Sequence, residues 1–477
     1  MGFAHSIYGR LPAGVQNALL SLHGRRLRGR RFGSLYREMR AILARAEGGG
    51  RDALLALQAQ LLRRLVVRAA RDVPYYETMF REAGVDPDSI REPADLRRLP
   101  ILKRQTVRDR REELVSRAFP RRALLHGHTS GTTGSSLPLL WDRNVDVVTN
   151  AVLWRHRAWA GCAFGTRYAS LLGRVVVPLS RRRPPFWREN RSWNQMLFSS
   201  FHMKEEHLDA YADAMERGRV RFLEAYPSTA YVLARHLVAR GRVLRLDAVF
   251  TSAEPLLGIQ RDTIEAAFSC RVFDYFGAAE RAIFAAECPE HRGLHLFDEY
   301  GVTELLDPAG RPVEPGKPGR LVVTGLHNFA MPLLRYELGD VSALAPEPCR
   351  CGRPLPLLLP VTTKAEDIVV LPDGRFISGS VLTHPFKPMT RIAESQIVQE
   401  RRDLVRVLIV AREGYGERDE ALLLGALRER LGGGVGVRIE RVASIPRGPR
   451  GKYRWVVSKV PLAFADGESP NLYAGNN

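Results

Sequence analysis

The chain places eight consecutive glycine, serine or threonine residues at 129–136, within the stretch HGHTSGTTGSSLPLLWD. Such a run is a poor helix or strand former, because glycine loses much backbone entropy on ordering and hydroxyl side chains compete for backbone hydrogen bonds. It can turn tightly and present N–H and O–H donors to an anion. A flexible surface turn would have a similar composition, but the residues that follow, LPLLW, are not typical of a linker. The run is therefore a candidate anion-binding loop.

Three cysteines and two histidines form a second set of residues with distinctive chemistry. Cys288, Cys349 and Cys351 together with one imidazole would make a closed tetrahedral zinc site, which braces structure because it has no open position for a substrate. His291 gives a C-x-x-H spacing and His295 lies on an apparent strand, so either could be the fourth ligand. Free thiols are the alternative. An odd total of five cysteines argues against a disulfide framework.

The hydrophobic pattern predicts the elements that must position these residues. Residues 1–95 read mostly as helices, as in RDALLALQAQLLRRLVVRAARDV, where apolar residues recur at helical spacing. From about 120 to 345, short apolar runs such as LDAVFTSAE and RVFDYFG alternate with amphipathic stretches such as RDTIEAAFSC. This alternation predicts an α/β domain with mostly parallel strand pairing.

The last part of the chain has a different pattern. After the proline-rich stretch RPLPLLLPVTT, VRVLIVARE predicts a strand, DEALLLGALRERLGGG a helix ended by glycine, and VRIERVASIP another strand. We therefore predict a large N-terminal domain over 1–363, in which 1–95 is a helical lead-in, and a small C-terminal α+β domain over 364–477.

Composition indicates a globular protein of 477 residues, with 45% hydrophobic and 26% charged residues. No apolar run reaches the roughly 20 residues that span a bilayer, and the N-terminus lacks the pattern of a signal peptide. The expected location is the cytoplasm.

The formal charge of +20 raises the question of nucleic-acid binding. Only seven of the 72 basic residues are lysine, and the arginines are spread from end to end rather than gathered in a stripe. Zinc-finger, RNP and basic-zipper patterns are absent from the sequence. Nucleic-acid binding is therefore disfavoured, and each of the rare lysines becomes informative.

Five stretches occur in an order and at separations that closely resemble the adenylate-forming ligase superfamily, whose members activate carboxylic acids as acyl-AMP. They are HTSGTTGSSLP, TSAEPL, DYFGAAERA, RYELGDV and IPRGPRGKYR. FGAAE resembles the Y-G-x-x-E motif with Phe276 in place of tyrosine, and YELGD resembles Y-x-x-G-D. PRGPRGK resembles the P-R-x-x-x-G-K motif, which carries the catalytic lysine.

The resemblance narrows further and covers nearly the whole chain. RDVPYYETMFREAG and LRRLPILKR are similar to the N-terminal signature of the phenylacetate–coenzyme A ligase branch. GRLPAGVQNALLSLHG and PPFWRENRSWNQMLFSSFHM are similar to the CapK-like subgroup of that branch. The resemblance implies a large adenylation domain of helices and mixed sheets, followed by a small mobile C-terminal α+β domain. A shared fold does not determine which substrate a protein uses.

The resemblance assigns the phosphates of ATP to the run of small residues. The hydrogen-bond donors to the phosphates would be Thr129, Ser130, Gly131, Thr132, Thr133 and Gly134. Thr132 is also assigned a catalytic role. The family's loop usually ends in a lysine that this chain lacks, so the loop would rely on neutral donors or on an arginine from elsewhere. Glu280 would bind the Mg²⁺ that bridges the phosphates.

The adenosine part of ATP is assigned to the ends of strands. Asp340 would accept both ribose hydroxyls, although a turn aspartate would fit LGD equally well in isolation. Tyr275 would stack on the adenine, with a core tyrosine as the alternative. The other residues assigned to nucleotide binding here are Ser252, Ala253, Glu254, Phe276 and Gly277.

Lys452 is assigned the catalytic role. Its ammonium group, on a flexible stem, can bridge the carboxylate oxygen and the α-phosphate as charge builds, and the context IPRGPRGK favours this over a solvated basic tail. By resemblance, the C-terminal domain rotates after adenylation, which removes Lys452 and opens a site for thioester formation. The hinge would fall at 364–367, where Lys364 and Glu366 depart from the family's Gly-Arg-x-Asp.

The sequence leaves three functions open. The first is adenylation of a small carboxylic acid followed by transfer to coenzyme A, with ATP and Mg²⁺ as cofactors and Zn²⁺ as a structural ion. The second keeps the adenylation and transfers the acyl group to an amine. The third is a non-catalytic basic protein that binds nucleic acid. No membrane partner is expected, and a homodimer is possible for either ligase.

Overall fold

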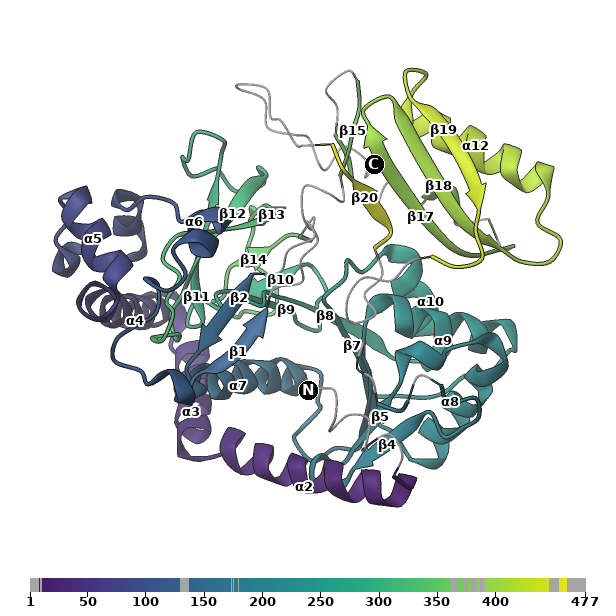
Figure 1. The fold of residues 1–477 in the computed structure, drawn as a ribbon, viewed down its shortest axis with the longest axis horizontal. Helices are drawn as coiled ribbons and strands as arrows, with labels where there is room; N and C mark the ends of the chain where they lie inside the picture. The colour runs from purple at the N-terminus through teal and green to yellow at the C-terminus, as the bar shows by residue number, and fades with distance from the viewer. Residues whose placement is uncertain are drawn as a thin grey trace.

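The computed structural model describes residues 8, 11–128, 137–172, 174, 176–178, 180–361, 368–372, 376–378, 382, 384–386, 389, 391–445 and 454–460. A large N-terminal α/β part carries a smaller part built from the end of the chain (Figure 1). No helix among these residues is both long enough and apolar enough to cross a membrane. The predicted boundary at 363/364 lies outside the described residues.

A nine-stranded mixed sheet forms the centre of the N-terminal part. Its strands in spatial order are β14 (Leu357–Leu358), β10 (Leu294–Leu296), β9 (Phe284–Glu287), β8 (Arg271–Gly277), β7 (Ala248–Ser252), β6 (Phe222–Ala225), β3 (Tyr168–Leu171), β5 (Gln195–Phe198) and β4 (Trp187–Asn190). Strands β8, β7, β6, β3 and β5 pair in parallel, and the flanking strands pair antiparallel. The prediction of an α/β domain with mostly parallel pairing is therefore confirmed for the middle of the sheet.

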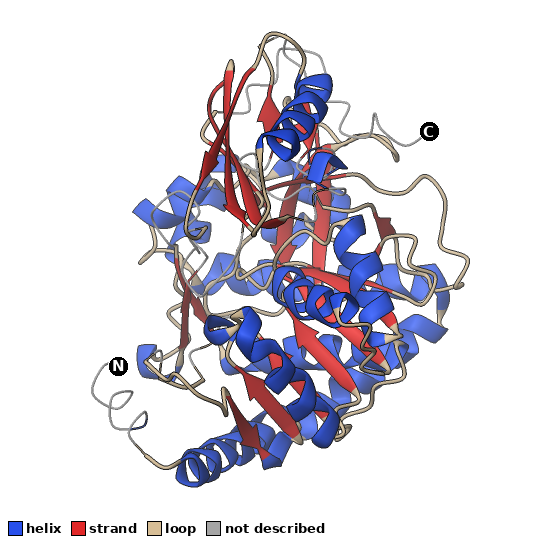
Figure 2. Ribbon diagram, turned by 90° about the vertical axis from the view of Figure 1, so that its right-hand side faces the viewer, coloured by secondary structure: helices blue, strands red, loops and turns tan. Residues whose placement is uncertain are grey.

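Helices cover both faces of this sheet, as its apolar parallel strands require. On one face lie α8 (Glu205–Arg217), α9 (Pro227–Ala239) and α10 (Gly258–Phe268), the helices on the side of the sheet that Figure 2 turns toward the viewer. They bury residues such as Tyr211, Leu233 and Phe268 against the strands. On the other face lies α7 (Arg143–Trp159), whose Asp142 caps the first N–H groups.

The chain begins with helices, as predicted. They are α2 (Ala13–Arg31), α3 (Ser34–Gly48), α4 (Gly50–Asp72) and α5 (Pro74–Ala83), followed by the short α6 (Arg104–Asp109). Short 3₁₀ segments occur at η1 (Pro87–Ser89), η2 (Pro93–Arg98), η3 (Arg121–Ala123), η4 (Arg191–Trp193), η5 (Ser200–His202) and η7 (His384–Phe386). Helix α2 crosses the edge of the central sheet, where the Trp193 indole donates to the Gly24 carbonyl at 2.8 Å.

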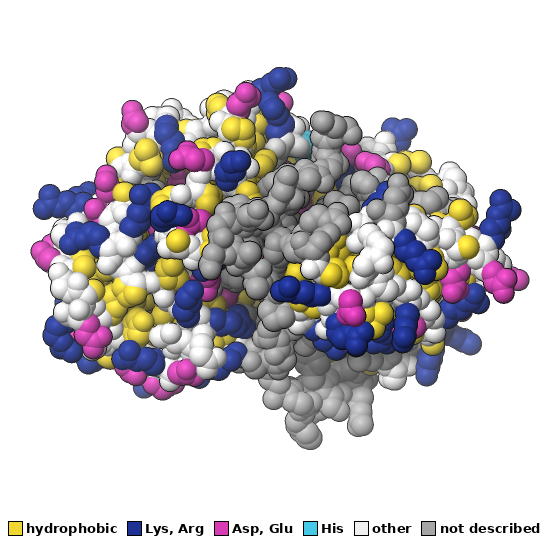
Figure 3. All heavy atoms as spheres, turned by 90° about the horizontal axis from the view of Figure 1, so that it is seen from above, with side chains coloured by type: hydrophobic (Ala, Val, Ile, Leu, Met, Phe, Trp, Pro, Cys, Tyr) yellow, Lys and Arg dark blue, Asp and Glu magenta, His cyan; other side chains and the backbone are white. Residues whose placement is uncertain are grey.

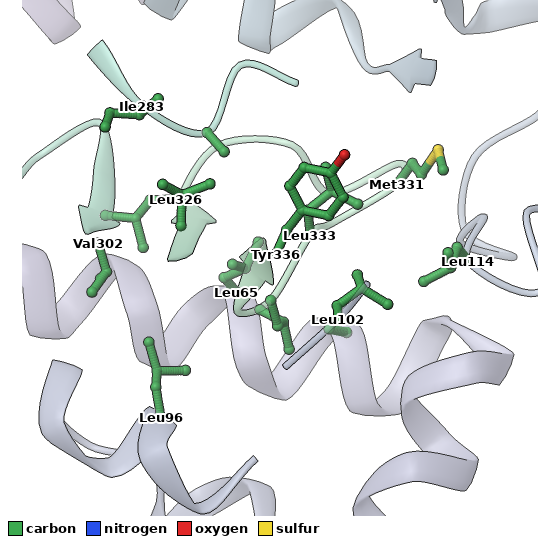
Figure 4. Packing of buried hydrophobic residues seen from close by; sticks show 14 of the residues in the cluster. Leu65, Leu96, Leu102, Leu114, Ile283, Val302, Leu326, Met331, Leu333 and Tyr336 are labelled. Atoms are coloured by element: carbon green, nitrogen blue, oxygen red, sulfur yellow. The ribbon is translucent and has the colours of Figure 1, made fainter. Parts of the chain in front are cut away.

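A second, three-stranded antiparallel sheet consists of β11 (Gly301–Leu306), β12 (Gly319–Gly325) and β13 (Tyr336–Ser342). Its apolar side packs with α4 and the following turns into the largest buried cluster, which includes Leu65, Leu96 and Leu102 (Figure 4). The hairpin strands β1 (Leu125–His128) and β2 (Pro138–Trp141) pair antiparallel on either side of the small-residue run.

The end of the chain forms its own core. Strands β19 (Gly436–Arg441), β18 (Leu404–Ala411), β17 (Ile392–Arg401) and β20 (Val456–Ser458) make a mixed sheet covered by α12 (Glu417–Leu431), and β15 (Ile368–Val370) pairs with β16 (Phe376–Ser378). Gly432 ends α12 where the sequence predicted a glycine stop. On the face shown in Figure 3, basic side chains occur on the left and on the right side, and acidic side chains lie among them.

Candidate active site

The carboxyl ends of β7 and β8 bring two predicted nucleotide residues side by side. Ser252, the last residue of β7, pairs in register with Tyr275 on β8, and the Ser252 side chain is buried. Ala253 follows with φ of 69°, a left-handed conformation that costs an L-residue about 1–2 kcal/mol. Strain of this kind is concentrated at functional sites. The chain therefore turns sharply at the edge where open α/β sheets bind ligands.

The Tyr275 ring packs as a core side chain would. It stacks on Phe284 with 5.3 Å between ring centroids and an interplanar angle of 19°. Burial raises the pKa of its hydroxyl to about 12, helped by the nearby Glu224 carboxylate and opposed by a hydrogen bond with Ser252. The hydroxyl is therefore neutral and points toward Ser252. Stacking of Tyr275 on adenine stays a prediction, as does nucleotide contact by its neighbours Phe276 and Gly277.

Glu280, the predicted Mg²⁺ ligand, is buried and held from two directions. The hydroxyl of Tyr336 donates to Glu280 Oε1 at 3.3 Å, and Nη1 of Arg104 lies 4.0 Å from the same oxygen. The Tyr336 ring lies in the apolar cluster while its hydroxyl points away from Leu65 and Leu102 (Figure 4). Burial, followed by the Glu280 charge, raises the pKa of Tyr336, so its proton stays available for the carboxylate.

Asp340 lies on β13, the strand that carries Tyr336. The pairing of β12 with β13 shifts register between Arg320 and Val322, and Gly339 has φ of 87°. Such a bulge re-aims the side chain that follows it, and glycine is needed at this backbone conformation. Asp340 is 6% exposed. The Gly-Asp pair therefore marks an irregular strand rather than a surface turn.

Several predicted residues lie outside the described part of the chain. These are the loop residues Thr129, Ser130, Gly131, Thr132, Thr133 and Gly134, the hinge residue Lys364, and Lys452. Glu254 is described and partly buried, directly after the strained Ala253.

The sequence analysis did not single out Arg104 or Tyr336 as site residues. Arg104 is the last residue of LRRLPILKR and the first of α6, and the bridge from Leu102 to Tyr336 joins this segment to β13. Tyr336 is the first residue of the YELGD motif. The YELGD motif was the available signal for Tyr336. Arg104 ends the quoted stretch LRRLPILKR, but only the fold shows that it lies beside Glu280.

The cysteine and histidine residues form a compact cluster with metal-binding geometry. One ligand atom from each of Cys288, His295, Cys349 and Cys351 lies within 4.8 Å of the others. The sulfurs of Cys288 and Cys349 are 3.7 Å apart, close to the separation of about 3.8 Å that tetrahedral zinc with Zn–S bonds of ~2.3 Å requires. Cys351 Sγ lies 3.3 Å from His295 Nε2. The four residues fit a closed tetrahedral ion.

His295, rather than His291, completes this set. Its Nδ1 lies 3.2 Å from the Leu355 carbonyl, to which it can donate, leaving Nε2 unprotonated toward the cysteines. Metal-bound histidines are commonly oriented by such a partner. His291 turns away at φ of 50°, with its Nδ1 3.2 Å from Glu287 Oε2.

Sequence comparisons match both halves of the chain. The CapK C-terminal domain family matches residues 369–459. Protein CapK of Staphylococcus aureus is 25% identical over 471 residues, which cover 95% of this chain and 99% of the relative. The phenylacetate–coenzyme A ligase of Thermus thermophilus is 30% identical over 347 residues, covering 67% of this chain and 72% of the relative. The Escherichia coli enzyme of the same name is 27% identical over 349 residues, covering 67% and 73%.

Solved structures of 2-hydroxyisobutyryl-CoA ligase share the fold. In its postadenylation state with 2-HIB-AMP, that ligase matches at a TM-score of 0.67 and 20% identity, over 87% of this chain and 91% of the other. In its thioesterification state with 2-HIB-AMP and CoA, the TM-score is 0.54 at 20% identity over the same shares.

Proposed function

The chain belongs to the phenylacetate–coenzyme A ligase branch of the adenylate-forming ligases and carries a CapK-type C-terminal domain, and from this premise we propose that it makes acyl-coenzyme A through an acyl-AMP intermediate. In the first step, a carboxylate oxygen attacks the α-phosphorus of ATP, and the bond to the β-phosphate breaks to release pyrophosphate. In the second, the thiolate of coenzyme A attacks the acyl carbonyl and AMP leaves.

The observation that carries the proposal is the anchored Glu280 carboxylate. Two anions meet in the first step, so catalysis consists of positioning and of neutralising charge. A buried carboxylate is the hard oxygen ligand that Mg²⁺ prefers, and the ion's remaining positions would be filled by phosphate oxygens and water. The Tyr336 hydroxyl, 3.3 Å from Glu280, fixes the orientation of this ligand.

Arg104 supplies a positive charge at this position. Its guanidinium lies 4.0 Å from Glu280, on the first turn of α6, and its side chain is 31% exposed. The family's loop lysine is missing from this chain. We assign Arg104 to the phosphates in place of that lysine, alongside the loop donors Thr129 to Gly134. Mg²⁺ bound at Glu280 would release the guanidinium for this contact.

Lys452 completes the adenylation site in this proposal, with Asp340 on the ribose. Its support is the PRGPRGK motif, which lies within the matched CapK-type domain. The C-terminal domain would carry Lys452 to the site for adenylation and away from it for thioester formation, about a hinge at Lys364.

One interface contact supports such an arrangement of the two parts. Arg235 on α9 donates to the carbonyls of Ile392 and Ala393 at 3.4 and 3.1 Å, where β17 begins. The higher TM-score with the postadenylation state of 2-hydroxyisobutyryl-CoA ligase, 0.67 against 0.54 for its thioesterification state, agrees with a domain arrangement of the adenylation type.

We assign the cluster of Cys288, His295, Cys349 and Cys351 to a structural Zn²⁺. Three thiolates and one imidazole leave the ion no open position, so it would brace the strands β9, β10 and β14 rather than act on substrate.

A pyrophosphate-release assay across aryl, fatty and sugar acids, with and without coenzyme A, tests the proposal. Release that requires an acid, and an acyl-CoA product that requires coenzyme A, is the expected result. Acid-dependent release with no acyl-CoA, but with an amide when an amine is supplied, would favour the amine-transferring ligase. No acid-dependent release, together with salt-sensitive DNA binding, would contradict both ligase functions.

A further inference from the structure

Helix α2 carries a row of apolar side chains on its outer side. Val15, Leu19 and Leu22 are 43%, 45% and 51% exposed, and they are three of the eight large apolar residues that are exposed in the described part of the chain. Spacings of four and three residues place them next to one another on one side of the helix. Single exposed apolar residues are ordinary, but a row on one helix indicates an interaction surface.

The inner side of α2 is less apolar than the outer side. The buried residues of the helix are Gln16 and Gly24, while Leu20 and Leu27 are partly buried and pack inward. A helix that only covered the edge of a sheet would turn its apolar side toward the core. Packing against the sheet therefore does not account for the leucines on the outside.

A basic segment continues the apolar row toward the end of α2. Arg25 and Arg26 are exposed and follow Leu22 by three and four residues, so they lie on its side of the helix. Neither makes an ion pair with another residue that the structure describes. The sequence of α2 contains no acidic residue, and Glu38 is the first one in the chain. The outer side of α2 is thus apolar in its first half and positively charged in its second.

The helix is held in place by contacts on its inner side. Its Arg31 binds Asp146 at 2.8 Å, and its Ser21 carbonyl accepts from the Ser192 hydroxyl at 2.6 Å. At Gly24 a β-carbon would come within 2.3 Å of Asn190 Oδ1, so the helix lies as close to the sheet edge as glycine permits. Figure 1 shows α2 along the lower edge of the molecule. The outer row is therefore formed before any partner arrives.

More arginines lie beside the start of α2. Arg182 and Arg183 are exposed, and the preceding Arg181 is close enough to Arg188 to lower its pKa, although burial contributes more. The Arg188 guanidinium in turn donates to Gln16 on α2. Positive charge therefore borders the apolar row at both of its ends.

We infer that α2 docks the protein on an anionic phospholipid membrane, with Val15, Leu19 and Leu22 toward the acyl chains and the arginines among the phosphate head groups. Burial of an apolar side and attraction to anionic lipids are the two contributions that hold a helix in this position. Such a helix lies on the bilayer without crossing it. The sequence-based expectation of no membrane partner considered only segments long enough to span a bilayer.

Other partners fit this surface less well. A second copy of the chain that docked through the same helix would place no acidic residue of α2 opposite Arg25 and Arg26. A nucleic acid would neutralise the arginines, but it would leave the apolar row exposed to water. An anionic membrane satisfies both halves of the surface.

Co-sedimentation of the full chain with lipid vesicles tests the inference. Binding to phosphatidylcholine vesicles that contain about 30% phosphatidylglycerol is expected to be at least tenfold stronger than to phosphatidylcholine alone. Leu19→Gln combined with Leu22→Gln should weaken binding about tenfold, because less apolar surface is buried. Arg26→Gln should weaken it about fivefold, the contribution of one arginine near an anionic surface.

Helix α12 supplies matched controls. Its Leu422 is 58% exposed and its Arg418 is exposed one turn earlier, but acidic residues share the first turn of that helix. Leu422→Gln and Arg418→Gln should bind the vesicles as the parent does. Circular dichroism shows that each variant is folded, which is expected because all the replaced side chains are exposed.

Three results would overturn the inference. One is a parent protein that does not bind the anionic vesicles. Another is parent-level binding by the folded α2 variants, because the overall charge of +20 would then account for the attraction. The third is a dimer in sedimentation velocity that the double leucine variant loses, with no vesicle binding by the parent, since a second copy would then cover this side of α2.

Discussion

At the scale of single residues, the candidate site depends on how Glu280 is anchored. A carboxylate that binds Mg²⁺ must stay ionised and oriented while buried, and burial alone would disfavour its charged form. The Tyr336 hydroxyl and the Arg104 guanidinium oppose that effect, at 3.3 and 4.0 Å from Oε1. Motif spacing identifies Glu280, but only the fold reveals Arg104, because 176 positions separate the two residues in sequence.

Replacing Arg104 tests its assigned role at the phosphates. Arg104→Gln is expected to lower kcat for pyrophosphate release by about ten- to a hundredfold, because one charge that neutralises the reacting phosphates is lost. Arg108→Gln is the matched control, since Arg108 lies on the same short helix and contacts the exposed Gln105. Equal activity of the two variants would remove Arg104 from the site.

The choice between the two histidines shows what spacing cannot decide. His291 lies three residues from Cys288 and has the more familiar zinc spacing, yet the fold turns it toward Glu287. His295 is seven residues away on β10, where pairing with β9 and β14 brings it to the cysteines. The sequence predicted the three cysteines and left His291 and His295 open as the fourth candidate ligand. Strand pairing shows that His295 is the histidine that lies beside the cysteines.

At the scale of elements, the pattern of apolar runs predicted the parallel strands and the helices between them. Strands β7 and β8 and helix α10 occur where LDAVFTSAE, RVFDYFG and RDTIEAAFSC indicated them. The irregular features were not predictable in the same way. The bulge at Gly339 and the antiparallel extension through β9, β10 and β14 depend on contacts between distant segments, which local periodicity does not report.

The cluster of Cys288, His295, Cys349 and Cys351, which joins strands β9, β10 and β14, predicts a bound zinc ion that stabilises the fold. We expect about one zinc per chain by elemental analysis of protein purified without added metal, because three thiolates and one imidazole bind zinc strongly. Cys349→Ser and His295→Ala should lose the zinc and lower the unfolding temperature.

Matched residues outside the cluster provide the controls. Cys270→Ser removes a thiol that is not part of the cluster, and His291→Asn removes the neighbouring imidazole. Both variants should keep the metal. Zinc retained by His295→Ala but lost from His291→Asn would reverse the assignment of the fourth ligand.

At the scale of the whole molecule, the C-terminal part must dock in an arrangement that suits adenylation. Arg235 is partly buried at this interface, and burial, followed by the nearby Arg412 charge, lowers its pKa while it donates to the start of β17. A guanidinium that has lost water must be held by its carbonyl partners. The contact therefore favours the docked arrangement over others.

Removing this contact should affect the two half-reactions unequally. Arg235→Leu is expected to slow pyrophosphate release several-fold while leaving acyl-CoA formation from preformed acyl-AMP nearly unchanged. Arg240→Leu, at the exposed end of the same helix, is the control because it contacts Asp209 and not the C-terminal part. A parallel loss in both half-reactions would contradict a role in docking.

The proposed mechanism requires distant segments of the chain to meet and neutralise charge when an acid is joined to AMP. Lys452 is the residue whose loss should lower the rate of adenylation most. The direct measurement is acid-dependent ATP–pyrophosphate exchange by Lys452→Ala beside Lys459→Ala. Lys459 is a control in the same domain, with its ammonium 3.3 Å from Glu400 and its side chain 64% exposed. We predict that Lys452→Ala loses about two to three orders of magnitude in exchange rate while Lys459→Ala keeps the parent rate. Exchange at the parent rate by folded Lys452→Ala would contradict the account.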